Sequence, residues 1–236
     1  MSTRESGLHV QPYGDSALLV RCLDGTAERT WTTLQLLSVR MRAAALNGVE
    51  SVVATFDTML VEFDPLRTDV PGLQRWLYEH VPEGDLRVGA GRVFRIPVAY
   101  GGDFGPDLPA VADELGLSVG EVVEMHSSTR WRVAFNGAPA GAPLHDGSPF
   151  GQAIRRMPQP RVRISAGTVA LAGHQGTIYT VVAPGGWRLI GRTPLRIVDK
   201  SVAGFVAVQP GDTLLFAPVS DREFAAIKPR FIGEPS

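Results

Sequence analysis

The second half of the chain most constrains its fold, because it consists of short strand-like segments divided by glycine and proline. Short strands with this punctuation and few helices among them are typical of a closed β-barrel or a β-sandwich. The predicted strands are Trp131–Phe135, Arg161–Ile164, Thr168–Ala172, Thr177–Val182, Arg188–Ile190, Leu195–Val198, Phe205–Val208 and Thr213–Pro218.

The first part of the chain has a different pattern, in which helical spacing of apolar residues alternates with strand-like runs. The order strand, strand, helix, strand, strand, helix predicts an α+β domain with both helices on one face of an antiparallel sheet. For the longer helix, Asp24 or Thr26 is the candidate N-cap and Asn47-Gly48 the stop. The predicted strands are Leu8–Tyr13, Ala17–Cys22, Val49–Thr55 and Met59–Phe63, and the predicted helices are Thr26–Leu46 and Val70–Val81.

A domain boundary is predicted at Pro82–Gly91, where glycine recurs and no apolar period continues. This divides the chain into an α/β domain over residues 1–90 and a mainly β domain over residues 91–236. The second domain begins with a predicted strand at Arg92–Tyr100.

Two short helices are predicted after that strand. Gly105-Pro106-Asp107 opens the first and Gly116 closes it. Ser118 and Glu121 have the spacing of a capping box for the second, which ends near His126.

Composition excludes several classes of protein. The formal net charge of −1 offers little attraction to a polyanion, so nucleic acid is not expected as the main ligand. The single cysteine, Cys22, cannot form an internal disulfide, and the start of the sequence has no apolar stretch like that of a signal peptide, so a cytoplasmic protein is expected. The most apolar tract, Phe205–Val219, is broken by prolines and is not expected to span a membrane. The five histidines never occur at metal-ligand spacing, so no metal site is expected.

A series of motifs in fixed order resembles the KipI family, also called allophanate hydrolase subunit 1 or the B subunit of 5-oxoprolinase (PxpB). The resemblance covers nearly the whole chain. Its motifs are Tyr13-Gly14-Asp15-Ser16-Ala17-Leu18-Leu19-Val20, Ile96-Pro97-Val98-Ala99-Tyr100-Gly101-Gly102, Gly105-Pro106-Asp107-Leu108, His126, Ala166-Gly167-Thr168-Val169, Ile178-Tyr179, Pro184-Gly185-Gly186-Trp187-Arg188-Leu189-Ile190-Gly191-Arg192-Thr193-Pro194 and Gly211-Asp212.

The resemblance implies a DCoH-like N-terminal domain and a cyclophilin-like β-barrel. It also implies a partner, a KipA-like protein also called allophanate hydrolase subunit 2 or the C component of 5-oxoprolinase, and a possible A component of the LamB/YcsF type. Relatives serve in ATP-dependent opening of 5-oxoproline to glutamate, in the carboxyltransferase part of urea carboxylase, and in inhibition of a sporulation histidine kinase. Because Gly191-Arg192-Thr193 lacks the glycine spacing and lysine of a P-loop, ATP is expected at the level of the complex and not on this chain alone.

The glycine pair before Trp187 is the first candidate for substrate binding. Gly185 and Gly186 can let backbone N–H groups approach a ligand closely and can adopt positive φ, which together would form an anion nest. The alternative is a tight turn with Trp187 packed beneath it. Arg188 or Arg192 is expected to hold a substrate carboxylate by paired hydrogen bonds, with Thr193 beside them.

His126 is the candidate catalytic acid or base, since the ordinary pKa of histidine lies near neutrality. The alternative is a structural role, in which its ring bonds free carbonyls at the end of the helix. His145 and His174 lie in predicted loops and are expected to be exposed.

One segment departs from the family pattern. Where the family usually has Gly-Phe-x-Pro-Gly-Phe-x-Tyr-Leu, this chain has Ala138, Ala142 and Leu144 in place of the aromatic residues. Apolar surface that lines a pocket is expected to be lost. Three functions therefore remain open: a subunit of an amide- or lactam-processing enzyme, a kinase-binding regulator with a flat apolar patch and no ligand pocket, and, on fold analogy alone, a prolyl isomerase.

Overall fold

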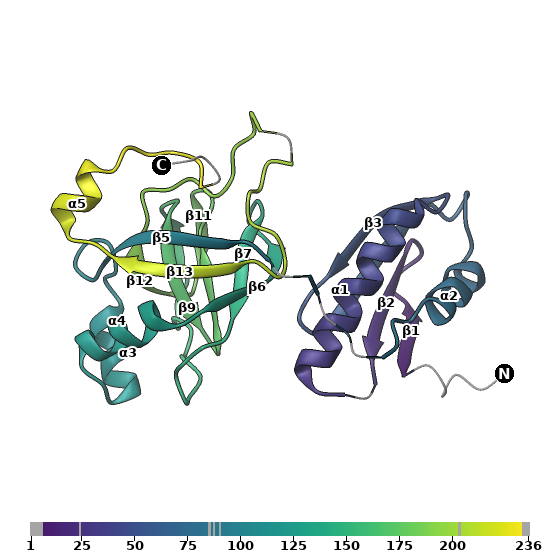
Figure 1. The fold of residues 1–236 in the computed structure, drawn as a ribbon, viewed down its shortest axis with the longest axis horizontal. Helices are drawn as coiled ribbons and strands as arrows, with labels where there is room; N and C mark the ends of the chain where they lie inside the picture. Colours follow the sequence, from purple (N-terminus) through teal and green to yellow (C-terminus); the bar gives the residue numbers. More distant parts are fainter. Residues whose placement is uncertain are drawn as a thin grey trace. The chain divides into compact units, whose positions relative to one another are not determined.

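The structure is a computed structural model that describes residues 7–23, 25–84, 86, 88–89, 91–202 and 204–232. The chain divides into two compact units, Met1–Gly89 and Ala90–Ser236, each with its own hydrophobic core (Figure 1). In the described part of the chain, no helix combines the length and the apolar character that crossing a membrane requires.

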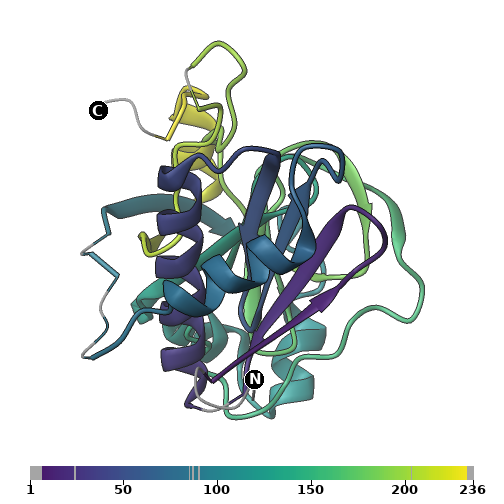
Figure 2. The ribbon, with the colours of Figure 1, turned by 90° about the vertical axis from the view of Figure 1, so that its right-hand side faces the viewer.

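The first unit has the predicted order of elements. Its four-stranded antiparallel sheet has the strand order β1-β2-β4-β3. The β1–β2 hairpin, in purple in Figure 2, is closed by the Tyr13 N–H, which donates to the Ala17 carbonyl over 2.8 Å. The elements are β1 (Leu8–Pro12), β2 (Ala17–Cys22), α1 (Ala27–Ala44), β3 (Val49–Ala54), β4 (Thr58–Phe63) and α2 (Val70–Glu79).

Alternate residues of these strands form a single core with both helices, as predicted. Thr26 caps α1, because its side chain accepts a hydrogen bond from the Arg29 N–H; the other candidate cap, Asp24, lies outside the described residues. The predicted stop at Asn47-Gly48 is wrong. The helix ends at Ala44, and Ala45 takes the left-handed conformation with φ 45°.

The second unit is a closed barrel of seven strands in the order β10-β7-β6-β13-β5-β12-β9, with a separate two-stranded β8–β11 sheet. The barrel alternative of the sequence prediction is confirmed, and the whole chain is a mixed α/β fold. The elements are β5 (Val93–Tyr100), α3 (Leu108–Leu115), α4 (Val119–Ser128), β6 (Trp131–Gly137), β7 (Ala142–Asp146), β8 (Arg161–Ile164), β9 (Thr168–Ala172), β10 (Gln175–Ile178), β11 (Ala183–Gly185), β12 (Arg188–Arg192), β13 (Thr213–Pro218) and α5 (Asp221–Ala226).

Several strand predictions for this unit are wrong. Residues 195–198 and 205–208 form only isolated bridges, because their apolar side chains pack onto the barrel from irregular segments. The strand predicted at Thr177–Val182 lies instead at Gln175–Ile178. The prediction missed β7, β11 and α5, and the two missed strands contain proline, which weakens the local strand pattern.

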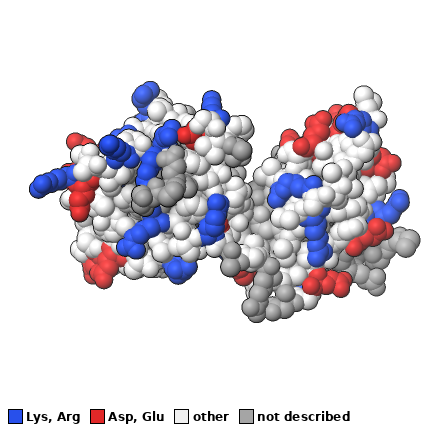
Figure 3. Space-filling view, turned by 45° about the horizontal axis from the view of Figure 1, so that its top comes forward, with Lys and Arg blue, Asp and Glu red and all other residues white. Residues whose placement is uncertain are grey.

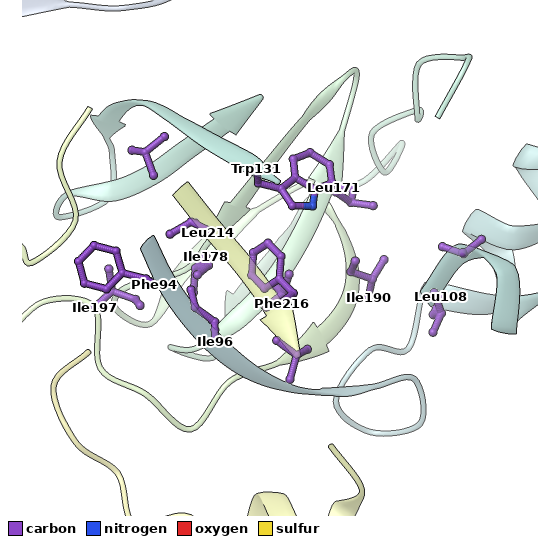
Figure 4. Close-up of a cluster of buried hydrophobic side chains, with 14 of the residues drawn as sticks. Phe94, Ile96, Leu108, Trp131, Leu171, Ile178, Ile190, Ile197, Leu214 and Phe216 are labelled. Carbon is purple, nitrogen blue, oxygen red and sulfur yellow. The ribbon is translucent and has the colours of Figure 1, made fainter. Parts of the chain in front are cut away.

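Large apolar side chains from β5, β6, β9, β10, β12 and β13 form the core of the barrel, including Trp131 and Phe216 (Figure 4). Helices α3 and α4 pack against β12 and β13. The predicted capping box of Ser118 and Glu121 at the start of α4 is confirmed.

A buried carboxylate fastens three elements of this unit. Asp107 lies just before α3, where it pairs with Arg161 of β8 through two hydrogen bonds of 2.7 and 2.9 Å and accepts the Leu189 N–H of β12 over 2.8 Å. The close approach also requires Gly105, because a Cβ there would overlap the Ile190 carbonyl. The motif around residues 105–108 is therefore structural.

Candidate functional site

A small cavity of about 170 Å³ lies where β7, β10 and β11 meet. We call it the Trp187 cavity. It is lined by Ala138, Pro139, Ala142, Leu144, Arg156, Thr177, Tyr179, Pro184, Gly185 and Trp187.

Polar groups without partners face this cavity. Thr177 is buried, and its hydroxyl oxygen has no hydrogen-bond partner among the described residues. Arg156 is exposed, and within the described ranges no hydrogen bond or ion pair engages its guanidinium. Desolvation by burial raises the pKa of Tyr179, while the charges of Arg156 and Arg161 act in the opposite direction. A neutral phenol, a free hydroxyl and a free cation therefore surround one small space, which suits a small ligand with a negative charge.

Gly185 shapes the cavity through close packing. A Cβ at this position would overlap the Tyr179 hydroxyl and press on the Ile164 side chain. The expectation of positive φ at Gly185 and Gly186 is wrong, since neither is among the left-handed glycines of the described chain. Gly185 thus allows the Tyr179 side chain to pack closely against it, and the pair does not form a left-handed anion nest. The expected approach of a ligand to the backbone N–H groups of these glycines stays a prediction.

The segment that departs from the family pattern forms one wall. Ala138, Ala142 and Leu144 all line the cavity, so their small size leaves space and does not remove the cavity. The bend before β7 contains Gly141 with φ 69° and a cis bond between Ala138 and Pro139. The Thr180 hydroxyl lies within hydrogen-bond distance of the Pro139 and Ala140 carbonyls, at 2.9 and 3.0 Å, which ties this bend to the end of β10.

A second, larger cavity of about 380 Å³ lies beside the first. We call it the Arg192 cavity, and Tyr179 borders both cavities. Its lining residues are Ala166, Gly167, Tyr179, Thr180, Arg192, Thr193, Pro194, Leu195, Arg196, Ile197, Phe224, Ala225, Ile227 and Pro229.

The predicted substrate-binding residues are divided between these places. Gly185 and Trp187 line the smaller cavity, whereas Arg192 and Thr193 line the larger one. Arg188 lines neither. Its Nε donates to the Arg155 carbonyl over 3.0 Å, and its terminal nitrogen lies 3.8 Å from Glu114.

Gly186 is buried beside the first cavity without lining it. Its carbonyl accepts the Met157 N–H over 2.7 Å, which fixes the turn between β11 and β12. Thr193 is also buried, and its hydroxyl accepts the Leu195 N–H over 3.3 Å. Both residues therefore have structural contacts next to the cavities.

His126 lies on α4, its ring packs against Trp131 and Phe216 of the barrel core, and it is not among the residues that line either cavity. Its ring is fully buried, its Nδ1 shares a 2.7 Å hydrogen bond with the Tyr100 hydroxyl, and its Nε2 has no partner in the part of the chain that the structure describes. Desolvation, with a smaller contribution from His145, lowers its pKa well below the ordinary value. The ring does not bond the helix-end carbonyls, and instead Trp131 donates to the backbone carbonyl of His126 over 2.9 Å.

The expectation that His145 is exposed is wrong. It lies on β7 with its side chain fully buried against Trp131 and Phe216, because β7 is a barrel strand and not the predicted loop. Burial lowers its pKa to about 3. The corresponding expectation for His174 is confirmed, since that residue is exposed.

Sequence reasoning missed the roles of Arg156, Thr177 and Tyr179. Arg156 is one of 21 arginines in the sequence, and basic side chains are spread over the face of the second unit that Figure 3 shows. What distinguishes Arg156 is the lack of an acidic partner beside a cavity, which no local spacing reveals. Among the described residues, no group of three or more acidic, histidine or cysteine side chains is arranged to hold a metal ion.

The chain is similar to a known protein family and to named members of it. Residues 8–206 match the family described as carboxyltransferase domain, subdomain C and D. The chain is 28% identical over 240 residues to the 5-oxoprolinase B subunit of Bacillus subtilis, covering 93% of this chain and 96% of that protein. It is 35% identical over 164 residues to the 5-oxoprolinase B subunit of Haemophilus influenzae, covering 70% of this chain and 74% of that protein.

Solved structures share the fold. The crystal structure of TTHA0988 has a TM-score of 0.75 and 31% identity, and the match covers 86% of this chain but only 40% of that one. The Kluyveromyces lactis urea amidolyase has a TM-score of 0.78 over 93% of this chain and 15% of its own length. At 19% identity, the second likeness concerns the fold alone.

Proposed function

The chain belongs to the family of 5-oxoprolinase B subunits, and we propose that it is part of a two-component complex that opens a small amide or lactam, 5-oxoproline to L-glutamate, in a reaction driven by ATP. The names of its relatives support this reaction. Allophanate is the alternative substrate in this proposal. The partner in this two-component complex is a KipA-like protein, the C component of 5-oxoprolinase, and a LamB/YcsF-type A component would join the pair as a third protein. ATP would bind at the level of the complex.

The observation that carries the proposal is the free Arg156 guanidinium beside the unpaired Thr177 hydroxyl in the Trp187 cavity. A small lactam acid has a carboxylate, which a guanidinium binds by paired hydrogen bonds. Its ring amide has a donor and an acceptor, which suit the hydroxyls of Thr177 and Tyr179. At about 170 Å³ the cavity suits a ligand of only a few heavy atoms.

This proposal assigns the substrate carboxylate to a different arginine from the two expected from sequence, Arg188 and Arg192, the second of which lines the larger cavity. Arg188 lies near Glu114 and is held by the Arg155 carbonyl, so it is not available in the cavity. Arg156 has no such partner in the described chain and lies at the cavity itself. His126 remains a proposed acid or base only if the complex gives a ligand access to the barrel interior.

The regulatory alternative requires a flat apolar patch without a ligand pocket, and the two cavities do not fit that requirement. The isomerase alternative rests on fold analogy, and no observation on the site favours it.

The decisive experiment measures ATP-dependent loss of 5-oxoproline by the reconstituted complex with and without this chain. We expect turnover only when the chain is present. Arg156→Met should raise KM at least about tenfold, because a charge-assisted hydrogen bond to the substrate is lost. Arg155→Met is the matched control, since its neighbouring guanidinium pairs with Glu114 over 3.3 Å and lines neither cavity. Full turnover without the chain would reject the proposal, and equal effects of the two variants would reject the role of Arg156.

A further inference from the structure

We propose that the Arg192 cavity is a second ligand site, which binds an organic anion with a carboxylate or phosphate head and a flat apolar body. The proposal concerns binding by this chain and does not depend on the lactam reaction. All its lining residues belong to the second unit.

The cavity has a cationic wall. Arg192 is half-buried, and its Nε donates to the Ala166 carbonyl over 3.3 Å, so the guanidinium is anchored while no carboxylate in the described chain pairs with it. Arg196 follows on the same wall and forms a 3.0 Å ion pair with Asp199. No acidic residue is among those that line the cavity, so its lining is positively charged. The guanidinium of arginine can bind either a carboxylate or a phosphate through two parallel N–H···O hydrogen bonds.

A second wall of the cavity is apolar and held in place. Phe224, Ile227 and Pro229 come from α5 and the segment after it. The Phe224 ring packs on Phe104 with 4.5 Å between centroids. A capping box at Ser220 fixes the start of α5. A flat or aliphatic group that packs on this wall would therefore meet a formed surface.

Size separates this cavity from its neighbour. Its volume of about 380 Å³ lies within the usual range of sites for drug-sized ligands, whereas the Trp187 cavity at about 170 Å³ lies below that range and suits only a small molecule. An inorganic anion alone would leave the apolar wall unused. The combination of charge, apolar wall and volume thus favours an anion with an organic body.

Tyr179 makes the two cavities neighbours, because it lines both. Its hydroxyl lies beside Gly185, on the side of the Trp187 cavity. A ligand in the Arg192 cavity would therefore lie next to any ligand in the smaller cavity, with one phenol ring between them.

The test is a titration of the isotope-labelled full chain, followed by backbone amide NMR, with three probes: AMP, benzoate and inorganic phosphate. We expect AMP or benzoate to shift amide signals of Gly167, Arg192 and Ile197 with a dissociation constant on the order of 1 mM or tighter. Inorganic phosphate should bind at least about tenfold more weakly than the better of the two, since it cannot use the apolar wall. The comparison of AMP with benzoate distinguishes a phosphate from a carboxylate head.

Arg192→Met should weaken binding of the better probe about tenfold or more, because it removes the anchored cation. Arg95→Met is the control, since Arg95 is exposed on β5 and lines neither cavity. Unchanged amide spectra with both organic probes, or equal affinity in wild type and Arg192→Met, would overturn the proposal. Neither result would bear on turnover by the complex or on Arg156, so this inference and the proposed function can fail separately.

Discussion

The Trp187 cavity and the interior of the barrel both hold buried polar atoms without hydrogen-bond partners, but their surroundings differ. Thr177 faces a cavity that also has a free guanidinium. The Nε2 atoms of His126 and His145 are instead enclosed by the rings of Trp131 and Phe216. An unpaired hydroxyl in a cavity that also holds a free cation is suited to bind a ligand. Unpaired imidazoles packed among aromatic rings instead make the stability of the fold sensitive to pH.

The largest expected effect is a loss of folding stability at low pH. The rings around His126 and His145 are Tyr100, Trp131 and Phe216, and none of them carries a negative charge that could stabilise an imidazolium. Burial holds both histidine pKa values below the unfolded value of 6.5, and that of His145 at about 3. The unfolded chain therefore binds more protons than the folded chain once the pH falls below that unfolded value. We expect the free energy of unfolding to be constant above it and to fall by about 1.4 kcal/mol per pH unit for each histidine below it.

Urea denaturation of the full chain at intervals between about pH 8 and about pH 4.5 measures this slope. His145→Leu should flatten the slope, since it replaces one of the two imidazoles by an apolar side chain of similar burial. His174→Leu is the control, because His174 is exposed and should leave the slope unchanged. A wild-type slope that does not differ from that of His145→Leu would contradict the assignment of the acid sensitivity to the barrel interior.

A smaller effect is expected at the wall of the Trp187 cavity. Gly185→Ala should lower the free energy of unfolding by about 1–3 kcal/mol, because the new Cβ overlaps the Tyr179 hydroxyl. Tyr179→Phe removes that hydroxyl, so the double variant should recover part of the loss, with a coupling on the order of 1 kcal/mol. Gly186→Ala should change stability little, since the nearest atom to its Cβ is the Met157 carbonyl oxygen at 3.7 Å. Thermal denaturation of the four proteins checks the cycle, and purely additive losses would show that the hydroxyl does not pack as described.

Local signals predicted much of the fold because the physics behind them is local. The capping box at Ser118 depends on residues three apart, and the bounds of Thr168–Ala172 follow from a continuous apolar run. Strand β7 could not be predicted in the same way. It contains Pro143 and His145, and its extended state depends on pairing with β6 and β10.

The residues of the candidate site were harder to predict from the sequence than the fold was. Arg156 and Arg188 look alike in sequence, and it is the contacts of Arg188 with the Arg155 carbonyl and with Glu114 that remove Arg188 from consideration. Thr177 faces Trp187 and Gly185 across a cavity because β7 and β10 pair beside the β8–β11 sheet. Such proximity arises from long-range pairing, which no motif of adjacent residues encodes.

The smallest effect is expected from Thr177→Val, and it bears most directly on the comparison between the Trp187 cavity and the barrel interior. This substitution should increase stability and weaken substrate binding. The free Thr177 hydroxyl is buried without a partner, so replacing it by a methyl group should raise the free energy of unfolding by about 1 kcal/mol. Thr168→Val should lower it by about the same amount, because the Thr168 hydroxyl donates to the Ser165 carbonyl over 2.8 Å. If the hydroxyl of Thr177 is kept for a ligand, the more stable variant should also show a raised KM for 5-oxoproline in the reconstituted complex. If Thr177→Val is more stable but KM is unchanged, the Thr177 hydroxyl does not bind the ligand and is, like the Nε2 atoms of His126 and His145, an unpaired buried group.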